Sequence, residues 1–290
     1  MALVSMKEIL EDAKARRYAV GCFNSIDLQM ARGVIEAAEE ERSPVILCHA
    51  AVHFKYTPLE KAAYVLLNEA KGAKIPVAVL LDHGEEFDSV IKAMHAGFNA
   101  VMFDGSRYDY EENVSKTKEI VRIAHTLGIS VEGELGRVAR PKSGWSEGSD
   151  DDSIIRDTSL YTDPDMAGEF VEKTGIDALA CSFGTVHGVY MEKPRLDYQR
   201  LGLIAQKSNI PIVMHGGSGL SEQDFLESIK HGVCKINYYT NMALSTAEYI
   251  KKKLSETEPA FYHDITTWSI EAVKQDIQSA IRVFKSSGKA

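Results

Sequence analysis

Short apolar runs alternate with longer amphipathic stretches along the whole chain. The runs have the length of strands, and the stretches between them carry apolar residues at helical spacing. This alternation predicts repeated strand–helix units and a parallel sheet. Eight strands are predicted, at Tyr18–Asn24, Pro44–His49, Val77–His83, Ala100–Ser106, Ser130–Gly136, Ala178–Gly184, Pro211–Gly217 and Cys234–Thr240.

A helix is predicted after each strand, at Leu28–Glu41, Leu59–Lys71, Glu85–His95, Glu112–Leu127, Met166–Lys173, Tyr198–Lys207, Glu222–His231 and Met242–Leu254. Further helices are expected near Met6–Arg16 and Ile270–Phe284. Eight such units predict an α/β fold, a closed (β/α)8 TIM barrel that forms a single domain over residues 1–290. The polar segment at about 137–162 is too long for an ordinary connection and is expected to be a mobile loop.

Charge and composition exclude several classes of protein. The 290 residues include 33 Lys+Arg and 42 Asp+Glu, a net charge of −9 with no cluster of cations, which argues against nucleic acid or an anionic membrane as partner. The apolar runs are shorter than the roughly 20 residues of a membrane-spanning helix. The start of the chain lacks the pattern of a secretory signal, so a cytoplasmic location is expected. The cysteines form no CxxC pair and are expected to be buried free thiols: Cys22, Cys48, Cys181 and Cys234.

Polar residues close most of the predicted strands, and in a barrel of this type the active site lies at the carboxyl ends of the strands. His83, His187 and His215 end the third, sixth and seventh strands and would converge above the barrel axis. A single such histidine is more often structural, but three at one level predict a catalytic metal site with an open position. The histidines on predicted helices or in the polar C-terminal segment are expected to be surface or capping residues: His95, His125, His231 and His263.

Carboxylates surround the predicted metal site. Asp104 and Glu134 end neighbouring strands and could hold a second cation or orient the histidines, and both interpretations stay open. Glu132 lies deeper in the barrel and is expected to be structural. Asp82 would face away from His83 in a regular strand, but a turn at the strand end would bring it to the site, where a carboxylate can move a proton.

A glycine-rich turn after the seventh strand predicts a phosphate site. Gly216, Gly217 and Ser218 offer backbone N–H groups and a hydroxyl, and barrels often bind phosphate in the loops after strands seven and eight. Ser221 resembles the N-cap of the next helix. Thr240, at the start of the eighth helix, would complete the cradle.

The segments "LDHG", "VMFDGS", "VEGELG", "GTVHG", "HGGSG" and "KIN" occur in this order over most of the chain. Together they resemble the class II, metal-dependent ketose-bisphosphate aldolases, which include the fructose- and tagatose-bisphosphate aldolases. The resemblance implies reversible cleavage of a ketose 1-phosphate or 1,6-bisphosphate to dihydroxyacetone phosphate (DHAP) and an aldehyde. It also implies a homodimer or homotetramer.

The resemblance assigns roles to individual residues. His83, His187 and His215 would bind the catalytic zinc, which as a Lewis acid stabilises the charge that develops during carbon–carbon cleavage. Asp82 would be the acid/base at the C4 hydroxyl, and Asp104 and Glu134 could hold a second divalent or monovalent cation. The residues expected to bind substrate are Asn24, His49, Gly188, Gly216, Gly217, Ser218, Asn237, Tyr238, Tyr239 and Thr240.

The sequence departs from the family on the distal half of the substrate site. The loop after "ELG" is longer than usual, and within it Glu147 is the predicted carboxylate that moves the DHAP proton. Arg137, Arg140 and Lys142 in this loop could meet an anionic substrate, although a solvated loop is the simpler interpretation. The stretch "EPAFYHD" stands where the family often has Asp-Pro-Arg, and His49 stands where it commonly has serine. These changes predict an acceptor aldehyde other than glyceraldehyde 3-phosphate, or one whose anionic end is held differently.

Three alternatives follow from the same residues. The first is ordinary fructose- or tagatose-1,6-bisphosphate aldolase activity, with loop cations replacing the missing arginine. The second is a metal-dependent hydrolase, because histidines and carboxylates at strand ends also activate water; the phosphate cradle argues against it. The third is a non-catalytic, zinc-containing sugar-phosphate sensor.

Overall fold

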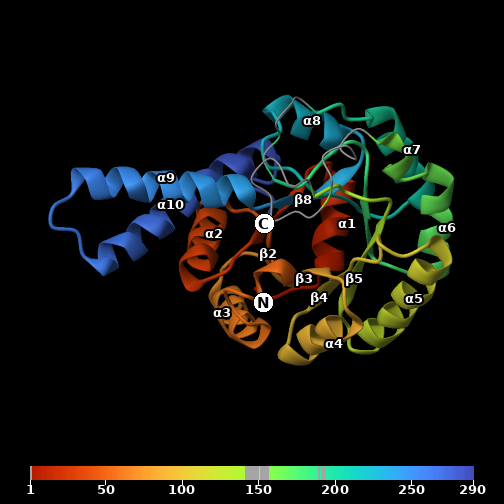
Figure 1. Ribbon diagram of the computed structural model, residues 1–290, viewed down its shortest axis with the longest axis horizontal. Coiled ribbons are helices and arrows are strands. Elements are labelled where there is room, and N and C mark those ends of the chain that lie inside the picture. The colour runs from red at the N-terminus through yellow and green to blue at the C-terminus, as the bar shows by residue number, and fades with distance from the viewer. Residues whose placement is uncertain (1, 141–149, 151–156, 189, 191–193) are drawn as a thin grey trace.

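Parallel strands paired in sequence order, with the last returning to the first, close the sheet into a barrel in the computed structural model (Figure 1). The structure describes all residues except 1, 141–149, 151–156, 189 and 191–193. Within the described residues the strands are β1 (Val20–Asn24), β2 (Val45–Ala50), β3 (Val77–Gly84), β4 (Ala100–Phe103), β5 (Ser130–Leu135), β6 (Ala178–Cys181), β7 (Ile212–Met214) and β8 (Val233–Tyr238). The predicted α/β barrel is therefore confirmed.

Helices surround the barrel and cover its outer face (Figure 1). They are α1 (Met6–Arg16), α2 (Leu28–Glu41), α3 (Leu59–Gly72), α4 (Phe87–Ala96), α5 (Tyr110–Thr126), α6 (Pro164–Thr174), α7 (Tyr198–Ser208), α8 (Glu222–Lys230), α9 (Thr240–Glu256) and α10 (Tyr262–Val283). Short 3-10 turns lie at Ala51–His53 and Thr158–Leu160. No helix among the described residues is long and apolar enough to cross a membrane.

The core has two layers because the residues of each strand point alternately into the barrel and toward the helices. Inside the barrel lie mostly small or slender side chains, such as Cys22, Ile46, Ala178 and Val213, and α1 packs against this layer. Between strands and helices lies a larger cluster that includes Phe23, Phe103 and Phe170. With both faces buried, the strands read as continuous apolar runs, which is why they could be recognised in the sequence.

The observed elements differ from the predicted ones mainly at their ends. β4 ends at Phe103 and β7 at Met214, several residues before the predicted limits, because the polar residues that follow leave the sheet. α10 begins at Tyr262, not near Ile270. His263 therefore lies in the first turn of this helix and not in a polar tail segment, which corrects the sequence interpretation.

The last two helices, α9 and α10, form a hairpin that extends beyond the barrel, and α10 returns along α2 (Figure 1). The contact between α2 and α10 is close at Gly33. A Cβ atom at this position would lie 2.7 Å from Cγ1 of Val273 and 3.0 Å from the carbonyl oxygen of Ile270. The glycine thus allows the two helices to approach.

Replacing Gly33 with alanine is expected to destabilise the protein by about 1 kcal/mol. The better helix propensity of alanine offers about 1 kcal/mol, but forcing a methyl group against a β-branched side chain and a backbone oxygen costs about 1–3 kcal/mol. Denaturant unfolding would measure the change. Gly72→Ala is the matched control, since that helix end has open space around it and should be unchanged or slightly stabilised. Equal stability of the two variants would contradict the expectation.

Candidate active site

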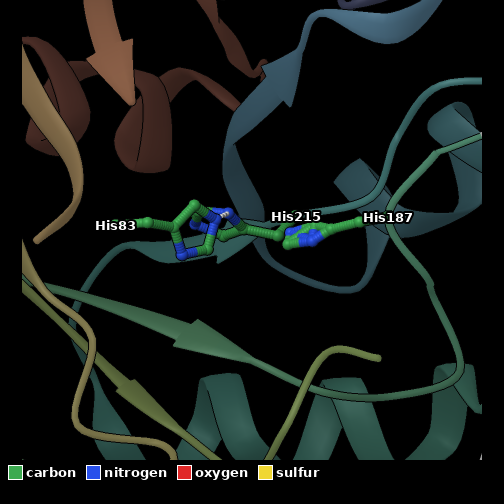
Figure 2. A group of neighbouring side chains, drawn as sticks. All are labelled: His83, His187 and His215. Carbon is green, nitrogen blue, oxygen red and sulfur yellow. Dashed lines mark hydrogen bonds between the residues drawn. The ribbon is translucent and has the colours of Figure 1, made fainter. Parts of the chain in front are cut away.

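Three histidine side chains meet at the carboxyl end of the barrel (Figure 2). His83 comes from β3, and His187 and His215 come from the loops after β6 and β7. Nε2 of His83 lies 3.0 Å from Nδ1 of His215, and the ring centroids of His83 and His187 are 4.9 Å apart. One nitrogen atom of each ring lies within 4.8 Å of the others. This spacing allows all three rings to bind a single metal ion.

The chemistry of these donors fits a metal ion. Burial lowers the pKa of His187 well below its usual value, and the charges of His83 and Arg140 add to this effect. Burial also lowers the pKa of His215. Neutral imidazole is the form that binds metal. Among the described residues, Nδ1 of His187 is one of the buried polar atoms that have no hydrogen-bond partner, and a cation bound by the three histidines would satisfy it.

The backbone at the end of β3 turns sharply. His83 has φ 48°, in the left-handed region that residues with a Cβ seldom adopt, and the pairing of β3 with β4 shifts register between Leu81 and Gly84. The alternation of side chains is broken there, so Asp82 and His83 both line the same cavity. The turn on which the role of Asp82 depended in the sequence is present, and its strained conformation is of the kind found at functional sites.

The other ring nitrogen of His83 faces two buried carboxylates. Nδ1 lies 2.9 Å from Oδ2 of Asp104 and 3.9 Å from Oε2 of Glu134. The three residues form a second group whose donor atoms lie within 4.8 Å of one another. Burial raises the pKa of Glu134 to about 8, and the negative charge of Asp104 contributes. Asp104 thus orients His83, and the pair of carboxylates also attracts positive charge.

A buried chain of polar groups continues from His215 across the barrel. Its Nε2 atom lies 2.9 Å from Oε1 of Glu132, whose other oxygen lies 2.7 Å from the ammonium group of Lys235. Lys235 donates a hydrogen bond of 2.6 Å to Oδ1 of Asn237, and the Asn237 amide donates one of 2.9 Å to Asp82. Glu132, expected to be only structural, therefore positions a candidate metal ligand, as carboxylates often do.

The glycine-rich turn after β7 lines the cavity that contains the histidines. Gly216 has φ 68°, and a Cβ there would lie 2.3 Å from the carbonyl oxygen of Val186, so only glycine fits. The Ser218 hydroxyl accepts the backbone N–H of Asn241 in the first turn of α9. The first residue of that helix, Thr240, lines the same cavity, and helix N-termini attract anions. Ser221 caps α8, as predicted.

One cavity of about 660 Å³ joins these features, a size that suits a sugar phosphate. Most of the predicted site residues line it: Asn24, Asp82, His83, His187, Gly188, His215, Gly216, Gly217, Ser218, Asn237, Tyr238, Tyr239 and Thr240. The structure therefore brings together residues from both ends of the chain.

His49 is not among the residues that line this cavity. Its side chain is buried with Nδ1 3.3 Å from the carbonyl oxygen of Ser25 and Nε2 2.9 Å from that of Thr57. The neighbouring residues Cys48 and Ala50 face the cavity instead, as the alternation of β2 requires. The structure thus gives His49 the role of holding loop backbone.

His53 is a cavity residue that the sequence interpretation missed. It is buried in the 3-10 turn after β2, with Nδ1 3.1 Å from the Asn24 amide and its ring centroid 4.6 Å from that of Tyr239. Its place in the segment "HAAVH", four residues past the end of the predicted strand, was the available signal.

The long loop after β5 is described only in part. Glu147 and Lys142 lie outside the described residues. Arg137 pairs with Asp150, and Arg140 reaches the site, where its guanidinium lies 2.9 Å from Oδ2 of Asp104. Arg140 is therefore not the solvated loop residue of the simpler sequence interpretation.

The chain is similar to known proteins over nearly its whole length. The profile of the family described as fructose-bisphosphate aldolase class-II matches residues 4–289. A probable fructose-bisphosphate aldolase of Bacillus subtilis (strain 168) is 39% identical over 297 aligned residues, and a fructose-bisphosphate aldolase of Staphylococcus aureus is 37% identical over 299. Each alignment covers 100% of both chains. The crystal structure of the YdjI aldolase from Escherichia coli K12 superposes with a TM-score of 0.85 at 33% identity, covering 99% of both chains.

Proposed function

This chain belongs to the class II fructose-bisphosphate aldolase family, and from that premise we propose that it is a zinc-dependent aldolase that releases DHAP from a ketose 1-phosphate or 1,6-bisphosphate. Membership makes it a lyase of carbohydrate metabolism, so the non-catalytic sensor and the hydrolase are set aside. The observation that carries the proposal is a single cavity that contains three converging histidines, a buried aspartate and a glycine cradle.

His83, His187 and His215 would hold the zinc ion, which when bound supplies a Lewis acid next to the substrate oxygens. The protein's own groups do the rest. Asp82 takes the proton of the C4 hydroxyl as the C3–C4 bond breaks and the aldehyde forms. Gly216, Gly217, Ser218 and the first turn of α9 bind the phosphate of the DHAP half.

Asn237 lies between Asp82 and Lys235 and fixes the position of the Asp82 carboxylate. Its amide donates to Asp82, while its oxygen is held by Lys235, so the side chain has one orientation. The protonation of the DHAP half after cleavage is assigned, as a prediction, to Glu147 in the loop after β5. Zinc identity and a homodimeric or homotetrameric assembly belong to the same proposal.

The distal end of the cavity supports an acceptor other than glyceraldehyde 3-phosphate. Among the described residues that line the cavity, Arg140 is the only lysine or arginine, and it is already paired with Asp104 and Glu85. The segment 258–264, where the family often has its arginine, lies at the α9–α10 connection, at the end of the hairpin that extends beyond the barrel (Figure 1). The names of the Bacillus and Staphylococcus relatives favour a second candidate, ordinary fructose-1,6-bisphosphate cleavage.

The test is DHAP release, measured by a coupled NADH assay, from matched ketose 1-phosphates and 1,6-bisphosphates that differ in the configuration at C4. A higher kcat/KM for ketose 1-phosphates would support the altered distal site. A preference for fructose 1,6-bisphosphate would establish the second candidate. Absence of DHAP from every substrate would contradict both.

Removal of the metal ion is expected to abolish turnover. Treatment with a chelator followed by its removal should reduce DHAP release to background, and stoichiometric zinc should restore it, because the three imidazoles bind metal tightly only as a set. Magnesium is the control, since it prefers oxygen ligands and should restore nothing. Full activity in a chain shown by elemental analysis to be metal-free would refute zinc dependence.

A further inference from the structure

The Arg140 side chain lies where a second cation would bind. Its guanidinium nitrogens lie 2.9 Å from Oδ2 of Asp104, 2.8 Å from Nδ1 of His83 and 2.7 Å from Oε1 of Glu85. The side chain is 30% exposed, against 5% for Asp104 and 2% for Glu134. A fixed positive charge therefore enters the group formed by His83, Asp104 and Glu134.

The backbone around Arg140 is held by contacts to two other segments. Ala139 forms a bridge with Val186 and accepts the N–H of His187, on the loop that carries one candidate metal ligand. The N–H of Arg140 donates to the Asp150 carboxylate, and the N–H of Asp150 donates back to the carbonyl oxygen of Arg140. These bonds fix the point from which the guanidinium reaches the carboxylates.

A guanidinium ion and a metal ion compete for this place. A metal held by Asp104, Glu134 and Nδ1 of His83 would need the Oδ2 atom and the ring nitrogen that Arg140 now contacts. The metal ion and the guanidinium would then contact the same atoms, and two positive charges that close together repel each other strongly in a buried, low-dielectric site. The arginine side chain is also always charged, so it compensates the negative charge of the buried carboxylates at any pH and whatever the supply of metal ions.

We propose that Arg140 is the resident cation of the His83–Asp104–Glu134 group, so that this enzyme binds one metal ion per chain and excludes a second ion from the carboxylate pair. The inference rests on the proposed function for the site at the three histidines. Arg140 acts as a positioning residue: its charge holds the Asp104 carboxylate beside Nδ1 of His83. The other nitrogen of His83 then stays directed at the histidine site.

The test compares ion binding in the wild type and in Arg140→Met, which keeps an unbranched apolar side chain and removes the guanidinium group and its charge. Both chains are loaded with one equivalent of zinc and dialysed against Mn²⁺, which prefers oxygen ligands. Elemental analysis then gives the ions bound. The wild type is expected to take up no manganese beyond its zinc, and Arg140→Met one Mn²⁺ per chain. Arg140→Lys should behave like the wild type because it restores a positive charge.

Arg107→Met is the matched control, because Arg107 pairs with Glu85 and Glu86 without reaching His83 or Asp104. It should bind no manganese. Uptake of Mn²⁺ by the wild type, or failure of Arg140→Met to gain it while circular dichroism shows a native fold, would overturn the inference. The readout does not require turnover, so loss of DHAP release from every variant would count against the proposed function alone.

Discussion

Asp82→Asn is expected to lower kcat by about 10²–10⁴-fold while leaving zinc content and fold unchanged, because general acid–base catalysis contributes a factor of that order. Asparagine has the same shape and can still accept the Asn237 hydrogen bond, but it cannot take a proton. Burial works to raise the pKa of Asp82, yet the charges of His83, His215 and Lys235 outweigh it and lower this pKa. The group that the substitution removes is therefore an ionised carboxylate, the form that can accept a proton.

The measurement is kcat for DHAP release, with zinc content determined on the same samples. Asp177→Asn is the control: Asp177 is also buried and hydrogen-bonded, but it precedes β6 and lies at the opposite end of the barrel. This control should lose stability with no comparable loss of kcat. If Asp82→Asn kept wild-type kcat, Asp82 would have no part in the proton transfer.

Lys235→Met is expected to destabilise the protein by about 3–5 kcal/mol, because removing one partner of a buried ion pair leaves the other charge uncompensated. Lys235 and Glu132 are both fully buried, with Nζ and Oε2 2.7 Å apart. Burial alone would lower the pKa of Lys235, but the acidic neighbours Cys22, Glu132 and Asp82 raise it. The lysine is thus a fixed charge inside the barrel.

Denaturant unfolding of the metal-free chains would measure the loss. The double variant Glu132→Gln/Lys235→Met should be less destabilised than Lys235→Met alone, because the uncompensated carboxylate is then also removed. Additive effects of the two substitutions would contradict the coupling. In the double variant His215 and Asn237 lose their charged partners, so kcat should remain low even where stability recovers.

The sequence predicted the order of the strands and most of the cavity, because buried parallel strands are apolar and their polar ends are distinct. It could not predict side-chain direction where the backbone departs from regular geometry. The left-handed turn at His83 brings Asp82 to the site, a possibility that periodicity alone would have excluded. His49 lies in a regular part of β2 and faces away from the cavity because it alternates with Cys48 and Ala50, whereas its place near the strand end had suggested the site.

Contacts between residues far apart in the chain could not be predicted from the sequence either. The Glu132–Lys235 pair joins β5 to β8, and nothing in the local pattern of either strand shows which charge the other meets. The sequence shows Arg140 as a cation in a long loop, but the contact of its guanidinium with Asp104 depends on the bridge between Ala139 and Val186. Such pairings follow from the three-dimensional closure of the barrel and not from spacing along the chain.

That closure has a consequence for biosynthesis. β1 has β8 as one of its two neighbours, so the sheet stays open until β8 has been made. Until then both outer strands present unpaired backbone groups, the template on which chains aggregate. A truncated product that lacks β8 would keep those edges permanently. It would also lack Lys235 and Asn237. The addition of β8 therefore both covers the open sheet edges of the nascent chain and completes its active site.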